Sequence, residues 1–137
     1  DIAQEIDYAW GKVNALDNLG RAYVDLGETQ KAIEISQQAL DIAQEIDYAW
    51  GKVNALDNLG RAYNDLSETP IAIEICQQAL DIAQKIDYAW GKVNALNNLG
   101  QAYNDLGETQ KAIEIFQQAS DIAKKAQLPT GRGKSYF

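Results

Sequence analysis

The sequence contains no histidine and no methionine, and Cys76 is its single cysteine in 137 residues. Histidine is the most common general base and metal ligand in proteins, so its absence argues against an active site and a metal centre. We therefore predict that the chain is not an enzyme and holds no cofactor. A single cysteine allows no internal disulfide and suits a reducing compartment, so we expect a cytoplasmic protein.

Long apolar runs and an excess of positive charge are also missing. No apolar stretch approaches the roughly 18 residues that a membrane span requires, and no secretory leader is visible. The formal net charge is −8, which disfavours nucleic acid and anionic membranes as partners because both attract Lys and Arg. Because the chain also begins within its repeated pattern, we expect it to be a piece of a longer protein.

What the sequence does contain is a repeat of forty residues. Residues 1–23 return without change at 41–63 and almost without change at 81–103. The blocks 1–40, 41–80 and 81–120 align without a gap, and the second and third differ from the first at five and six positions. Such a period is typical of stacked repeat arrays. Because strand signals are missing, the pattern predicts an all-α solenoid.

Each block is expected to form two helices. Apolar residues such as Val13, Leu16 and Tyr23 recur at three- and four-residue steps, which is the spacing of one helix face. Gly27 suits the left-handed conformation that ends the first helix, and Ser67 at the same place is expected to cost up to ~1 kcal/mol. The predicted helices are 9–26, 29–46, 49–66, 69–86, 89–106 and 109–126.

This pattern predicts one array over residues 1–126, with units at about 9–46, 49–86 and 89–126. Residues 1–6 are expected to be the end of a preceding helix. Residues 127–137 are expected to be a disordered tail or an expression remnant. The segment GRGKS within them is similar to a phosphate-binding loop, but Leu128 stands where that motif requires a glycine.

The ordered set Leu16, Leu19, Gly20, Tyr23, Ala32 and Ala39 closely resembles the tetratricopeptide repeat, W-x2-L-G-x2-Y followed by two alanines. Leu16 departs from it at the tryptophan position, and of Ser36, Cys76 and Phe116 only the last matches the family's large aromatic position. The forty-residue length is similar to that of kinesin light chains and Pins-type scaffolds. The resemblance implies a right-handed superhelix of antiparallel helix pairs, with small residues at Gly20, Ala32, Ala39, Gly60, Ala72, Ala79, Gly100, Ala112 and Ala119.

The polar face of each first helix is the candidate binding surface. In the family that the chain resembles, this face lines a concave groove for peptides, and an asparagine before the Leu-Gly pair often bonds the peptide backbone. An asparagine suits this role because it offers both donors and an acceptor, and an arginine can bond a carboxylate. The candidate residues are Asn14, Asp17, Asn18, Arg21, Asn54, Asp57, Asn58, Arg61, Asn94, Asn97, Asn98 and Gln101.

We therefore predict a non-catalytic module that binds a protein or peptide. Two alternatives remain: a structural array that self-associates as a homo-oligomer through its repeat ends, and a sensor arm of a larger signalling enzyme. A polar helix face is also often only a solvated surface, and Asn18 could instead bond across to the next repeat. Trp10, Trp50 and Trp90 are expected to pack between repeats, and Cys76 is expected to fill the core.

Overall fold

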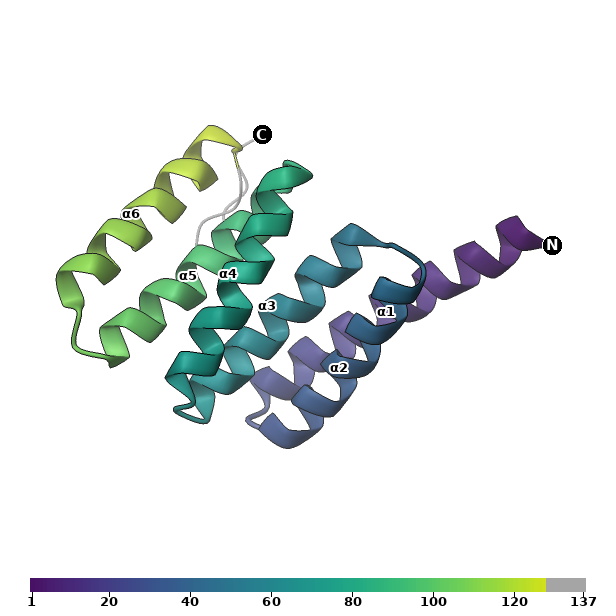
Figure 1. The fold of residues 1–137 in the computed structure, drawn as a ribbon, viewed down its shortest axis with the longest axis horizontal. Helices are drawn as coiled ribbons and strands as arrows, with labels where there is room; N and C mark the ends of the chain where they lie inside the picture. Colours follow the sequence, from purple (N-terminus) through teal and green to yellow (C-terminus); the bar gives the residue numbers. More distant parts are fainter. Residues whose placement is uncertain (128–137) are drawn as a thin grey trace.

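The computed structural model describes residues 1–127, which form six α-helices and no strand (Figure 1). The helices are α1 (Ile2–Asp25), α2 (Thr29–Glu45), α3 (Ala49–Asp65), α4 (Thr69–Lys85), α5 (Ala89–Asp105) and α6 (Thr109–Lys125). The predicted all-α solenoid is confirmed, and the helices after the first begin and end within one residue of the predicted bounds. The predictions for residues 128–137 lie outside the described residues.

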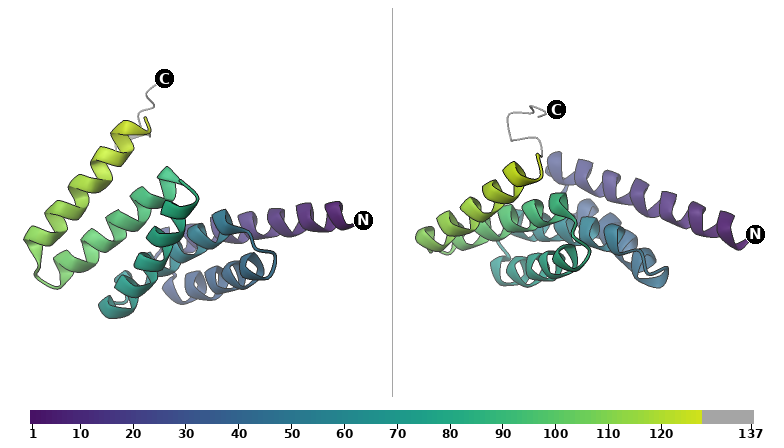
Figure 2. Two further views of the ribbon diagram at one scale, coloured as in Figure 1. Left: turned by 45° about the horizontal axis from the view of Figure 1, so that its top comes forward. Right: turned by 90° about the horizontal axis from the view of Figure 1, so that it is seen from above.

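The first helix differs from the prediction. Residues 1–6 do not end a separate helix, because α1 runs without interruption from Ile2 to Asp25. In the later repeats the chain turns at Asp47 and Asp87, whose φ angles are 55° and 53°. The helices on either side of these turns pack against each other, and we attribute the left-handed backbone there to this packing, because such a residue is otherwise unfavourable. Asp7 holds the same place in the first repeat without such packing, so the helix continues and projects from the array (Figure 2).

The turns inside the helix pairs follow the prediction. Gly27 and Gly107 adopt φ angles of 78° and 83°, in the left-handed region that glycine enters without steric cost. Ser67 takes the same conformation in the middle repeat, with φ of 59°. The expected strain at the serine is therefore present, and the backbone path of the turn is kept in spite of it.

The helices form two layers that follow the repeat. Each helix packs against the next one in the chain, and α1 also contacts α3, which in turn contacts α5. Within residues 1–127, the second helices α2, α4 and α6 do not contact one another. In the view of Figure 1, α2 and α4 lie in front of the layer of first helices. Because the layer with the closer helices forms the inner side of a curved array, the first helices line its concave side.

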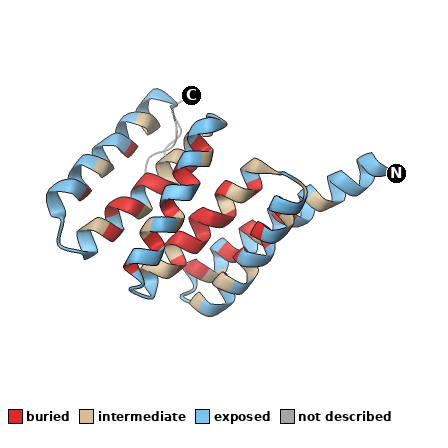
Figure 3. Ribbon diagram, in the orientation of Figure 1, coloured by how far each residue is buried: buried red, intermediate tan, exposed pale blue. Residues whose placement is uncertain are grey.

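Small residues lie where the two helices of a pair meet. The predicted alanines are all buried, with exposed fractions of 2% or less for Ala32, Ala39, Ala72, Ala79, Ala112 and Ala119. A methyl group added at Gly20 would lie 2.5 Å from Ser36 Oγ, and one at Gly100 would lie 2.5 Å from the Phe116 ring. At Gly60 it would collide with Cys76 Sγ. These contacts allow the helix pairs to approach closely, and the buried residues concentrate in the middle repeat (Figure 3).

A second set of close contacts joins one repeat to the next. A methyl group added at Gly51 would lie 2.5 Å from Val13 Cγ1 and 2.8 Å from a ring carbon of Tyr48. Gly91 meets Val53 and Tyr88 in the same way. Gly11 holds the same position in the first repeat, where no atom lies within 4 Å of an added methyl group. The same repeat position is therefore tightly packed at Gly51 and Gly91 and open at Gly11.

This pair of environments gives a matched test of packing between repeats. We expect Gly51→Ala to lower the free energy of unfolding by about 1–3 kcal/mol, because the added methyl group overpacks the contact with Val13 and Tyr48. The control, Gly11→Ala, should raise it by about 0.5–1 kcal/mol through helix propensity alone. Urea denaturation followed by circular dichroism at low protein concentration measures both. Equal effects at the two sites would contradict close packing at Gly51.

Candidate functional site

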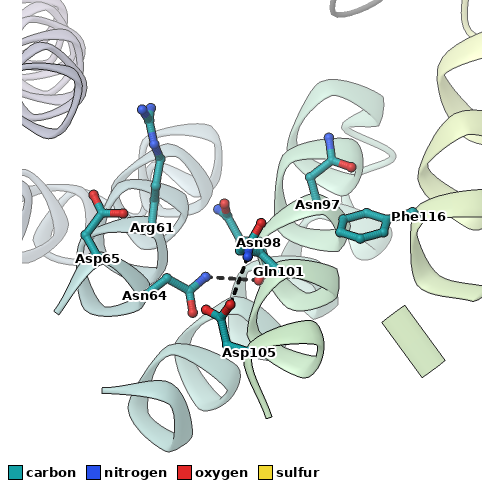
Figure 4. A pocket seen from close by; sticks show the side chains of 8 residues that line it. All are labelled: Arg61, Asn64, Asp65, Asn97, Asn98, Gln101, Asp105 and Phe116. Atoms are coloured by element: carbon teal, nitrogen blue, oxygen red, sulfur yellow. Dashed lines mark hydrogen bonds between the residues drawn. The ribbon is translucent and has the colours of Figure 1, made fainter. Parts of the chain in front are cut away.

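A cavity of about 450 Å³ lies on the concave side between α3 and α5. Its wall is largely polar, and one aromatic side chain, Phe116 of α6, contributes to it (Figure 4). The lining residues are Arg61, Asn64, Asp65, Asn97, Asn98, Gln101, Asp105 and Phe116. Four of them, Arg61, Asn97, Asn98 and Gln101, belong to the set predicted from the sequence.

The asparagines before the Leu-Gly pairs bond within the chain. Asn58 Nδ2 donates to the backbone oxygen of Asp17 at 2.9 Å, and Asn98 Nδ2 donates to that of Asp57 at 3.3 Å. These bonds join each repeat to the preceding one, so the alternative structural role describes Asn58 and Asn98. Asn18 is exposed, and its Oδ1 accepts from Arg21 at 3.5 Å.

The asparagines one turn earlier also join repeats. Tyr48 donates its hydroxyl proton to Asn14 Oδ1 at 2.9 Å, and Tyr88 donates to Asn54 at the same distance. Asn94 occupies this position in the third repeat and is half-buried. Two of the three asparagines predicted to bind a ligand at this position therefore already accept a hydrogen bond from a tyrosine of the same chain.

The tyrosines that make these bonds also stack on the repeated tryptophans. The rings of Trp10 and Tyr48 lie 5.2 Å apart, and those of Trp50 and Tyr88 lie 4.4 Å apart, in stacked orientation. Each pair spans two repeats, as the expectation of packing between repeats requires. Cys76 is fully buried, as expected for a core position.

The two predicted aspartates do not line the cavity. Asp17 and Asp57 are buried, with exposed fractions of 5% and 6%, and within the described residues none of their carboxyl oxygens has a hydrogen-bond partner. Burial raises the pKa of Asp17 to about 8. Burial, and then the charge of Asp17, raises the pKa of Asp57 well above its usual value. Asn97 holds the same repeat position, and there the side chain is exposed and contributes to the cavity.

One arginine and three carboxylates lie on or beside the cavity wall. Arg61 binds Asp25 of the preceding repeat, with 2.6 Å between the guanidinium and carboxylate atoms. Gln101 replaces the arginine in the third repeat and donates to Asp105 Oδ1 at 3.0 Å. Asp65 adds a second carboxylate to the cavity wall. With Arg61 engaged by Asp25, the cavity carries an excess of negative charge.

Sequence reasoning missed four residues of the cavity wall. Asn64 donates to the backbone oxygen of Asn98 at 3.0 Å, and Asp65 and Asp105 follow one residue after this repeat position. Phe116 was noted in the sequence only as a match to the family's large aromatic position, and it is 37% exposed. The sequence held a signal for this region, because the third repeat differs from the first at six positions and three of them, Asn97, Gln101 and Phe116, line the cavity.

Neither a metal site nor a membrane-spanning helix is found among the described residues. Within residues 1–127, no group of three or more Cys, Asp or Glu side chains is placed to hold a metal ion. None of the six helices combines the length and hydrophobicity needed to cross a membrane.

Comparison with protein families identifies the repeat. A family model described as tetratricopeptide repeat matches residues 52–125, which is more than half of the chain, and a second model with the same description matches residues 15–46. Comparison with curated proteins found no match.

Similar helical arrays occur among solved structures. The TPR domain of Arabidopsis FLU is 19% identical, has a TM-score of 0.76 and pairs 85% of this chain with 98% of that domain. A Rap protein complexed with competence and sporulation factor is 21% identical with a TM-score of 0.82, and 91% of this chain covers 34% of it. A protein described as "Podosopora anserina putative kinesin light chain nearly identical TPR-like repeats" is 24% identical with a TM-score of 0.68, at coverages of 83% and 56%. These similarities support the fold.

The buried aspartates predict an unusual dependence of stability on pH. The unfolded carboxyl groups have pKa values near ~3.9, whereas burial raises the pKa of Asp17 to about 8. The folded state therefore binds the proton of Asp17 more tightly than the unfolded state does. The contribution of this proton to folding stability is complete below about pH 4 and is lost as pH rises through about 8. We expect the free energy of unfolding to fall between about pH 5 and 8, by at most ~1.4 kcal/mol per pH unit for each aspartate.

The comparison variant carries Asp17→Asn and Asp57→Asn, which introduce the residue present at position 97. We expect it to be more stable at pH 8 by about 1–3 kcal/mol, because no carboxylate is then buried without a partner. Its stability should also depend less on pH over the same interval. Urea denaturation at several pH values measures the stability of each protein and its pH dependence. The same pH dependence in the variant and the unchanged chain would contradict the assignment of this dependence to the two buried aspartates.

Proposed function

Because the chain belongs to the tetratricopeptide repeat family, we propose that it is an interaction module whose cavity between α3 and α5 holds an extended segment of a partner protein. The observation that carries the proposal is the composition of the cavity wall. The exposed amides of Asn97 and Gln101 lie on α5, and the partly exposed ring of Phe116 comes from α6. Amides can pair with a peptide backbone, and an exposed ring offers an apolar contact.

The charge of the cavity favours a basic partner. Asp65 and Asp105 line the wall, and the guanidinium of Arg61 is already bound to Asp25. The whole chain carries a net charge of −8, which attracts positively charged segments over distances up to the Debye length. We therefore propose a segment with Lys or Arg directed toward the two aspartates and an apolar side chain against Phe116.

The proposed role is binding without catalysis. Burial, and then the charge of Asp57, raises the pKa of the Cys76 thiol to about 12, so this cysteine is not a thiolate nucleophile at neutral pH. A single buried thiol also fits the reducing conditions of the cytoplasm, where we place the protein.

Substitution of two charges tests the proposed partner chemistry. We expect Asp65→Asn with Asp105→Asn to weaken binding of Lys- and Arg-containing peptides by about 2- to 30-fold, because each of the two exposed ion pairs contributes ~0.2–1 kcal/mol. The control, Asp41→Asn with Asp81→Asn, makes the same change in net charge on exposed positions of the second helices. A fluorescence-anisotropy titration with a library of basic and acidic extended peptides measures binding.

The outcome for the control decides the location of the site. Unchanged binding in the control and weaker binding in the cavity variant would support the cavity. Equal losses would mean that net charge alone attracts the peptides. Selective binding of acidic peptides would also contradict the proposal.

A further inference from the structure

The two junctions between repeats use one set of contacts. At each junction a tyrosine stacks on the tryptophan of the preceding repeat and donates its hydroxyl proton to an asparagine there. At each junction a valine of the preceding repeat packs on a glycine. An asparagine amide donates across the junction to a backbone oxygen. Arg61 of the second repeat also binds Asp25 of the first.

Within the described residues, the first repeat exposes the receiving half of this contact set. Tyr8 corresponds to Tyr48 and is 75% exposed. Gly11 corresponds to Gly51, but no atom lies within 4 Å of a methyl group added there. Asn18 and Arg21, which correspond to Asn58 and Arg61, are both exposed. We call these four residues the N-terminal face.

The third repeat presents the matching half. Trp90 corresponds to Trp10 and Trp50 and is 39% exposed. Val93 corresponds to the valines that pack on Gly51 and Gly91, and Asn94 corresponds to the asparagines that accept a hydrogen bond from a tyrosine. Both residues are half-buried. Asp105 holds the position of Asp25 and is exposed. We call these four residues the C-terminal face.

We propose that the N-terminal face of one chain docks on the C-terminal face of a second copy, head to tail, and repeats the internal junction between molecules. Tyr8 then stacks on Trp90 and donates to Asn94, Val93 packs on Gly11, and Arg21 pairs with Asp105. The second copy is the occupant because the internal junctions already show the same residue types bonded in the same pairs. Such a contact leaves one face free at each end, so it can continue into a linear assembly.

Docking requires a local change in α1. Tyr48 and Tyr88 immediately precede helices and follow the left-handed residues Asp47 and Asp87, whereas Tyr8 lies inside α1. The first turns of α1 must therefore unwind so that Asp7 can adopt the left-handed conformation. Glycine enters that region without a steric cost. We expect Asp7→Gly to strengthen association by several fold.

A larger side chain at Gly11 should have the opposite effect. We expect Gly11→Val to weaken association at least about tenfold, because the new side chain occupies the space that Val93 of the second copy requires. The control, Gln38→Val, adds the same side chain at an exposed position of α2. Sedimentation velocity of the full chain over a range of concentrations measures association, and circular dichroism confirms that each variant is folded.

A charge exchange tests the direction of docking. Arg21→Asp and Asp105→Arg should each weaken association, because each places like charges opposite one another at the contact. A mixture of the two variants should associate like the unchanged chain, since every contact between unlike variants then pairs opposite charges. Recovery in the mixture supports head-to-tail docking. Equal association of the separate and mixed variants would overturn it.

Two further results would also overturn the proposal. One is a full chain that stays monomeric at every concentration while a form ending at residue 127 associates. That result would mean that the occupant of the C-terminal face is the segment 128–137 of the same molecule and not a second copy. The other is a strict monomer in both forms.

Discussion

The structure depends on the close approach of helices at glycine positions. Gly51 and Gly91 each contact a valine of the preceding repeat and the ring of the tyrosine three residues earlier in the chain. Gly20, Gly60 and Gly100 contact side chains from the second helix of their own pair. A glycine inside a helix costs about 1 kcal/mol relative to alanine, so this spacing is obtained against local helix propensity. The apolar contacts that it permits offset that cost. A single pair buries neither of its faces fully, which is why the repeats are stable together and not alone.

The period, the helix bounds and the small core residues could be predicted because each depends on local spacing. The roles of the polar residues could not. Asn58 bonds a backbone oxygen that is 41 residues away, and a helical wheel does not show which polar side chain meets a neighbouring helix. Asp17 and Asn97 occupy one repeat position, yet one is buried and the other exposed. The continuous α1 was also missed, because the turn at Asp47 depends on packing from a preceding helix, which Asp7 does not have.

Near-identical repeats still produce a local difference on the concave side. Asn97, Gln101 and Phe116 replace Asp17, Arg21 and Ser36 of the first repeat, and all three line one cavity. The exchange from Ser36 to Phe116 changes a fully buried core position into a ring that is 37% exposed. Three of the six substitutions that distinguish the third repeat from the first therefore lie at the cavity proposed to bind a partner segment.

The uneven burial along the array has a consequence for its motions. α3 contains nine buried residues, whereas α6 contains two. In an array where each repeat is stabilised by its neighbours, opening begins at the ends and moves inward. Backbone amides of α6 and of the first turns of α1 should therefore exchange with deuterium through frequent local opening, and those of α3 only through unfolding of the whole chain. The terminal repeats are then the parts that can rearrange while the central helix keeps its place.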